Sequence, residues 1–183
     1  MTRQMHDFPA TSASGDGVRI EEMAPALRLS LRVRAAHAPV LGRALGLDLP
    51  DRVGRTAREA SRTALCLGPD EWLICAPQEA RGEILAAAAG VYGAAPHALV
   101  DISDREISYA ITGPQAQALL SIACPRDLDR LEEGQGVRTV FDSAQVVLWR
   151  DGAQAFRLDV WRSFALHVRA LLDIGQRELA AGL

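Results

Sequence analysis

The sequence places a strand, a sharp turn and a helix in direct succession within residues 100–128, and this succession limits the folds that the chain can adopt. From Glu106 to Thr112, apolar and polar residues alternate, which is the period-2 pattern of a strand with one buried face. Gly113-Pro114 ends the strand, because glycine permits a sharp turn and proline suits the first position of a helix. Apolar residues then recur at helical spacing: Ala116, Leu119, Leu120 and Ala123. We therefore expect a short helix that folds back onto a sheet.

Two β-hairpins are predicted, one in each half of the chain. In the first, apolar runs lie on both sides of a Gly-Pro-Asp-Glu turn within residues 63–76. In the second, the pair Asp151-Gly152 is a strong turn signal and separates the strands predicted at 144–149 and 156–161. Both hairpins favour antiparallel sheets.

Prolines and a serine mark the predicted starts of the remaining helices. Pro39 and Pro77 suit first helical positions, and the hydroxyl of Ser163 suits the N-cap of the last helix. Residues 51–62 are predicted to be a polar connection. Four residues are predicted to form the buried face of the last helix: Phe164, Val168, Leu171 and Leu172.

The two halves follow the same order of elements, which predicts a duplicated unit. Each half has a strand, a proline-started helix, a hairpin and a longer helix, and LDLPD in the first corresponds to PRDLD in the second. We predict an α+β fold of two pseudo-repeated βαββα-type units, in which helices pack on antiparallel sheets. Residues 1–22 are a predicted flexible N-terminal arm, residues 23–97 the first half and residues 98–183 the second half of one compact domain.

Polar side chains occupy one face of the strand predicted at 26–34. Leucine and valine alternate there with Arg28, Ser30, Arg32 and Arg34. We favour a solvated basic face, because arginine is mostly exposed in folded proteins. The alternative is that this face meets an acidic partner.

A group of carboxylates lies at the entry to the strand at 106–112. Asp101, Asp104 and Glu106 lie close to Arg105 in the sequence. Paired carboxylates can perform acid–base catalysis. At a strand entry beside an arginine, however, we favour a solvated ion-pair group.

No catalytic, cofactor-binding or metal-ligating residue is predicted in this chain. The sequence has no GxSxG, GxGxxG or Walker A motif, and it contains no lysine for a Schiff base or a P-loop. Cys66, Cys75 and Cys124 lack CxxC spacing, so we expect buried, inert thiols rather than a disulfide framework or a zinc site. The histidines are scattered, and His167 has no second ligand four residues later.

The tryptophans lie in or beside the predicted hairpins. Apolar neighbours favour a core position for Trp72 and Trp149. Trp161 lies beside Arg162, and we predict that it is a contact residue, because tryptophan is enriched at interface anchors.

Charge and hydropathy argue against two classes of partner. The chain has 20 basic and 23 acidic residues and a net charge of −3, whereas nucleic-acid surfaces are strongly basic. The N-terminus has no signal-peptide h-region, and no apolar run reaches the roughly 18 residues that a membrane span needs. We expect a soluble, cytoplasmic protein that binds neither nucleic acid nor a membrane.

Several segments resemble one family in the same order. These are DISDREISYAITGP at 101–114, CPRDL at 124–128 and WRSFALHVRALLD at 161–173, with LGPDEWLIC at 67–75 as a further segment. On these segments, the chain resembles the gamma subunit of heterotetrameric sarcosine oxidase over about residues 26–180. The strand–Gly-Pro–helix unit more distantly resembles the folate-binding aminomethyltransferase fold of the glycine-cleavage T-protein.

The resemblance implies a subunit of an oxidoreductase complex. Sarcosine oxidase of this type oxidatively demethylates sarcosine to glycine, passing the one-carbon unit to tetrahydrofolate and electrons to oxygen. The expected partners are the alpha, beta and delta subunits. FAD, FMN, NAD and the folate site are expected on the large subunits and zinc on the smallest, with no cofactor in this chain. The resemblance carries over no catalytic residue, so it implies a non-catalytic structural subunit.

Two other functions remain open at the level of the sequence. One is a folate-binding aminomethyltransferase-like domain, although the T-protein is a considerably longer chain. The other is a stand-alone scaffold or ligand-binding module. Co-purification separates them, because a gamma subunit is expected to accompany flavin-containing partners.

Overall fold

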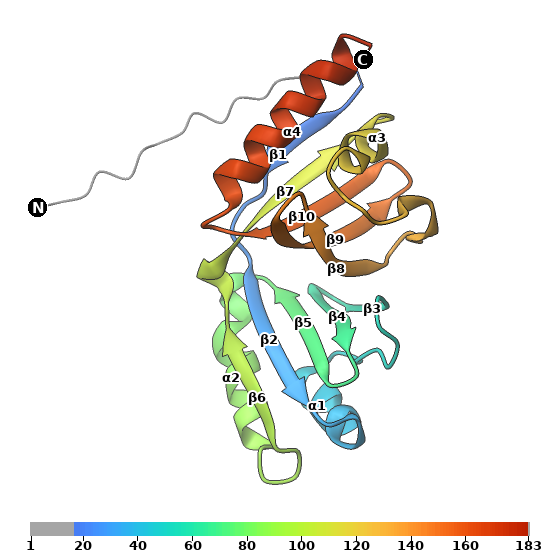
Figure 1. The fold of residues 1–183 in the computed structure, drawn as a ribbon. Helices are drawn as coiled ribbons and strands as arrows, with labels where there is room; N and C mark the ends of the chain where they lie inside the picture. Colours follow the sequence, from blue (N-terminus) through green and yellow to red (C-terminus); the bar gives the residue numbers. More distant parts are fainter. Residues whose placement is uncertain (1–16, 183) are drawn as a thin grey trace, which may run out of the picture.

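Two five-stranded antiparallel sheets, each with helices on one face, make up residues 17–182, the part of the chain that the computed structural model describes (Figure 1). The strand order is β3-β4-β5-β2-β6 in the first sheet and β1-β7-β10-β9-β8 in the second. The predicted α+β class, with helices packed on antiparallel sheets, is confirmed.

The first sheet contains the first predicted hairpin. Its helices α1 (Ala38–Leu45) and α2 (Arg81–Gly90) cover one face, and all six residues of β5 are buried. Pro39 lies in the first turn of α1, as predicted, and Gly46 ends that helix with a left-handed φ of 58°. The strands are β2 (Leu27–Val33), β3 (Thr56–Glu59), β4 (Arg62–Gly68), β5 (Glu71–Ala76) and β6 (His97–Asp101).

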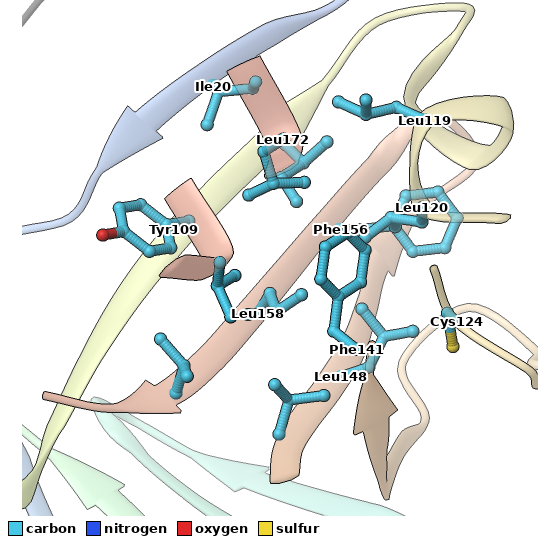
Figure 2. Close-up of a cluster of buried hydrophobic side chains, with 14 of the residues drawn as sticks. Ile20, Tyr109, Leu119, Leu120, Cys124, Phe141, Leu148, Phe156, Leu158 and Leu172 are labelled. Carbon is cyan, nitrogen blue, oxygen red and sulfur yellow. The ribbon is translucent and has the colours of Figure 1, made fainter. Parts of the chain in front are cut away.

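The second sheet packs against α3 (Ala116–Ser121) and α4 (Ala165–Ala180). Figure 2 shows the apolar side chains between this sheet and its helices, including Phe156 and Leu158 from a central strand and Leu172 from α4. The strands are β1 (Arg19–Glu22), β7 (Glu106–Thr112), β8 (Gly136–Phe141), β9 (Ala144–Gly152) and β10 (Ala155–Trp161). Single-turn 3₁₀ helices occur at Ala35–His37, Gln78–Ala80, Ser103–Arg105 and Leu128–Arg130.

The two sheets have corresponding strand orders. β3, β4, β5 and β2 occupy the positions that β8, β9, β10 and β7 occupy in the second sheet. The fifth position is filled by β6, after α2, in one sheet and by β1, from the N-terminal side, in the other. Each half has three strands between its helices rather than the two of the predicted βαββα-type unit, and the pseudo-repeat itself stays a prediction.

The edge strands β1 and β6 alter the predicted boundaries. We predicted a flexible arm at 1–22; residues 1–16 lie outside the described part, and residues 19–22 form β1 because Ile20 is buried in the core of the second sheet. β6 pairs with β2, so the chain passes between the sheets after residue 101 rather than at residue 98.

Two predictions about connections are wrong. The predicted polar connection at 51–62 contains β3, whose main chain pairs with β4 although its side chains are mostly polar. Asp151-Gly152 belongs to β9, and the turn follows at residues 153–154, because a bulge at Ala155 and Phe156 shifts the register.

The predicted start of α4 is also wrong. Ser163 does not cap the helix, because the main chain already turns there: the N–H of Phe164 donates to the carbonyl of Trp161 at 2.8 Å. Phe164 is the N-cap and is 41% exposed rather than buried. Val168 and Leu172 are fully buried, as predicted.

Two leucines on α4 test the position of the core. Replacing Leu172→Ala, at 0% exposure, should lower the free energy of unfolding by about 2–5 kcal/mol, because it opens a cavity between α4 and the sheet. Leu166→Ala, at 63% exposure, is the matched control and should change it by less than about 0.5 kcal/mol. Urea unfolding of the purified chain measures both, and equal effects would contradict the packing described.

Candidate functional site between the two sheets

The faces of the two sheets that carry no helices pack against each other. Leu65 and Leu73 from the first sheet meet Val147 and Trp149 from the second in a separate buried cluster. Gly136 permits this approach, because a Cβ there would lie 2.8 Å from a methyl group of Leu65. The polar faces of β2, β7 and β10 meet beside this cluster.

A buried charged network occupies the meeting point. Arg28 of β2 is 4% exposed, and its Nη2 donates to Ser108 Oγ and lies 3.6 Å from Asp159 Oδ1. Ser108 in turn donates its hydroxyl to Asp159 Oδ1, and the Trp149 indole Nε1 donates to Oδ2 at 2.7 Å. Glu106 adds a second carboxylate, with Oε2 3.9 Å from Arg28 Nε. We call these five residues the inter-sheet network.

The network corrects the prediction of a solvated basic face on β2. Arg28 is buried against carboxylates, and these belong to the same chain rather than to the acidic partner of the alternative interpretation. Glu106 was predicted to be solvated and is 6% exposed. Alternation shows that a strand has two unlike faces, but it does not show what covers the polar one. Asp159 was not predicted to be a functional residue. It lies among apolar residues of β10, and a carboxylate at such a position was the sequence signal that could have identified it.

The structure separates the three predicted carboxylates. Asp101 accepts from the Ser103 hydroxyl at 2.6 Å and pairs with Arg81 at 2.7 Å, and the Ser103 hydrogen bond is the main cause of its lowered pKa. Asp104 is exposed, and Glu106 is buried in the network. They do not converge on one reaction centre.

A second ionic contact joins the sheets at β5 and β8. Arg138 binds both oxygens of Glu71 through its two terminal nitrogens, and Arg32 approaches the same carboxylate at 3.0 Å. The hydrogen bond from Arg138 is the main reason that the pKa of Glu71 lies below its ordinary value of 4.5.

The cysteines lie where the sequence predicted, in buried positions. Cys66, Cys75 and Cys124 are free thiols. Burial, with a smaller contribution from Asp159, raises the pKa of Cys75 to about 12, and burial also raises the pKa of Cys66. Since the thiolate is the nucleophilic form, neither Cys75 nor Cys66 is activated for chemistry at neutral pH.

A small cavity adjoins the network. It has a volume of about 20 Å³, and its lining includes Glu71, Arg105, Glu106 and Trp161. This volume admits about one water molecule and is far below the volume of a drug-sized ligand site. The cavity is therefore no site for a folate.

The tryptophans divide as the sequence suggested. Trp72 and Trp149 are 2% and 1% exposed and belong to the core. Trp161 is 40% exposed, and the guanidinium of Arg105 lies 5.3 Å from its ring centroid. Its predicted role as a contact residue stays a prediction.

Side chains of the types that ligate metals are dispersed over residues 17–182. There, no three or more His, Cys, Asp or Glu side chains are grouped to hold a metal ion. His167 pairs instead with Asp142 at 2.9 Å, and the hydrogen bond from His167 is the main cause of the lowered pKa of Asp142.

None of the helices within residues 17–182 combines the length and the apolar character of a transmembrane segment.

A comparison with protein families supplies the decisive observation. The model described as "Sarcosine oxidase, gamma subunit family" matches residues 32–176. The chain belongs to the sarcosine oxidase gamma subunit family. The resemblance stated from the sequence is confirmed.

Individual relatives agree with the family match. The chain is 35% identical to sarcosine oxidase subunit gamma of Corynebacterium sp. (strain U-96), over 90% of this chain and 82% of that one. It is similar to a chain of heterotetrameric sarcosine oxidase from Corynebacterium sp. U-96 in complex with pyrrole 2-carboxylate, with a TM-score of 0.83, 30% identity and coverage of 93% and 89%.

A more distant likeness concerns the fold alone. Glycine cleavage system aminomethyltransferase T from Bartonella henselae matches this gamma-subunit-family chain with a TM-score of 0.65 and 14% identity. The match covers 85% of this chain and 45% of that one. The predicted likeness to the aminomethyltransferase fold is confirmed at this level.

Removing Arg28 tests the inter-sheet network. Arg28→Met should cost about 3–5 kcal/mol of unfolding free energy, because it leaves two buried carboxylates without their cation. Combining it with Asp159→Asn should cost at least about 1 kcal/mol less than the sum of the single changes. Urea unfolding of the parent chain, the two single variants and the double variant measures this coupling.

Arg130→Met is the control, because Arg130 and its partner Asp127 have side chains that are 86% and 56% exposed. It should change the free energy of unfolding by less than about 0.5 kcal/mol. Strict additivity would contradict the network.

Acid should weaken the Glu71–Arg138 contact. Because the pKa of folded Glu71 lies below 4.5, its contribution is present above that pH and is lost as pH falls through the folded-state pKa. Glu71→Gln should therefore be less stable than the parent chain at neutral pH, and the difference in the free energy of unfolding should narrow as the pH falls below about 4.5. Chemical unfolding at several pH values measures it. Arg138→Gln removes the same contact and should show the same trend; a difference independent of pH would contradict this account.

Proposed function

We propose that this chain is the gamma subunit of a heterotetrameric sarcosine oxidase and that it acts there as a non-catalytic structural subunit. The complex would oxidatively demethylate sarcosine to glycine with tetrahydrofolate and oxygen. The observation that carries the proposal is the likeness to a chain of heterotetrameric sarcosine oxidase, which extends over 93% of this chain and 89% of that one.

The use of the buried charged groups supports a structural role. Arg28, Glu106 and Asp159 contact each other across the sheets, and Glu71 contacts Arg138. A catalytic acid or base needs access to a substrate, whereas these groups border a cavity of about 20 Å³. The chain is therefore suited to docking rather than to chemistry.

The proposed partners are the alpha, beta and delta subunits, in the cytoplasm. FAD, FMN, NAD, zinc and tetrahydrofolate would be bound by those subunits and not by this chain. A stable contact between subunits buries about 1,600 Å² in total. Trp161 is a proposed contact residue of such an interface, because it is large, 40% exposed and held under the guanidinium of Arg105.

Omission of the chain tests the proposal. The four subunits would be co-expressed with and without this chain, and the product analysed by mass, flavin absorbance and turnover of sarcosine. We expect that omission prevents normal assembly and flavin loading, because the large subunits lose a structural contact. Normal assembly, flavin content and turnover without the chain would defeat the proposal.

The likeness to an aminomethyltransferase fold leaves folate binding as the second candidate. Titration of the purified chain with tetrahydrofolate tests it, and micromolar binding would favour it over a purely structural role. A stand-alone scaffold or ligand-binding module is the third candidate. That function would be favoured if the chain fails to co-purify with flavin-containing subunits.

A further inference from the structure

The edge strand β6 presents main-chain groups that point away from its sheet. Within residues 17–182, β2 is the strand that pairs with it (Figure 1). The N–H of Ile102 donates to the carbonyl of Arg28 at 2.9 Å, so the pairs Val100–Ser30 and Ala98–Arg32 are the hydrogen-bonded ones. The N–H and C=O groups of Leu99 therefore point to the opposite side, as the alternation in an antiparallel pair requires.

In the edge strand β6 the one charged side chain, Asp101, lies at the C-terminal end and pairs with Arg81 at 2.7 Å, so the positions before it carry no charge. β1 carries charged side chains at three of its four positions, β3 ends in Arg-Glu, and β8 contains Arg138. In β6, no formally charged side chain occurs from His97 to Val100. Soluble proteins protect free edges with charges, proline or bulges, because an unprotected edge pairs with other chains.

The side chains beside this edge indicate which strand would fit it. Val100 is 55% exposed and lies across from Ser30 on the face without helices. Arg34 follows Arg32 on that face; it is exposed and has no ion-pair partner among residues 17–182. A strand with an apolar side chain beside Val100 and a carboxylate near Arg34 would be complementary.

We propose that β6 is a docking edge, to which an extended segment of a partner subunit adds as a further strand. The segment bonds to the free main-chain groups of Leu99, covers Val100 with an apolar side chain and places a carboxylate near Arg34. The inference rests on the proposed function, since the partner is taken to be another subunit of the oxidase complex.

A lysine at Val100 tests the edge in the co-expressed complex. Val100→Lys should weaken incorporation of this chain about tenfold or more, because a charge would be buried against the apolar side chain of the added strand. Val53→Lys is the matched control: Val53 is 63% exposed, lies between α1 and β3, and should leave incorporation unchanged. Thermal unfolding of both variants should match the parent chain.

Hydrogen–deuterium exchange supplies a second measurement on the unmodified chain. The amide of Leu99 should exchange at least about tenfold more slowly in the complex than in the isolated chain, because it becomes a strand donor. Suppose that the parent chain assembles with flavin-containing subunits without slower exchange at Leu99, and that Val100→Lys assembles equally well. The edge proposal is then overturned, and the proposed function stands. If the parent chain does not assemble with them, both fail. If the isolated chain forms dimers that Val100→Lys abolishes, a second copy occupies the edge and the proposal is wrong.

Discussion

Arg28 loses almost all of its contact with water where the two sheets meet, and the arrangement of the sheets depends on how that charge is balanced. A buried cation without a partner is strongly destabilising. The structure supplies Asp159 from β10, 3.6 Å away, and the Ser108 hydroxyl from β7. Asp159 receives further hydrogen bonds from Ser108 and Trp149. Strands from both sheets therefore depend on one another for their charge balance, and neither polar face is satisfied alone.

The inter-sheet network favours one arrangement of the sheets more than it adds stability. Arg28 Nε and Glu106 Oε2 are buried and have no hydrogen-bond partner in the structure. A buried ion pair with such incomplete bonding contributes little net stability. It does penalise any displacement of the sheets, since a displacement would separate buried charges. The Glu71–Arg138 contact adds a second constraint at the other side of the interface.

The buried polar groups between the sheets serve contacts within the chain. The buried charges that resemble catalytic groups in the sequence hold the sheets together, and the cavity beside them is small. The exposed surface includes Trp161, with the guanidinium of Arg105 near its ring, and the edge strand β6. A subunit that acts by docking fits membership of the gamma subunit family.

The sequence by itself determined the local elements whose side chains carry a periodic signal. Alternation identified β2, β7 and β10, and helical spacing with Gly113-Pro114 identified α3, because burial of one face imposes a period on the residues. It did not find β3, whose pairing depends on main-chain groups, nor the turn at 153–154, which a bulge displaced. Only the tertiary structure decided that the polar faces of β2, β7 and β10 cover each other. The reason is physical: a strand's own residues show that its polar face needs a polar environment, but water and an opposing charged sheet both meet that need.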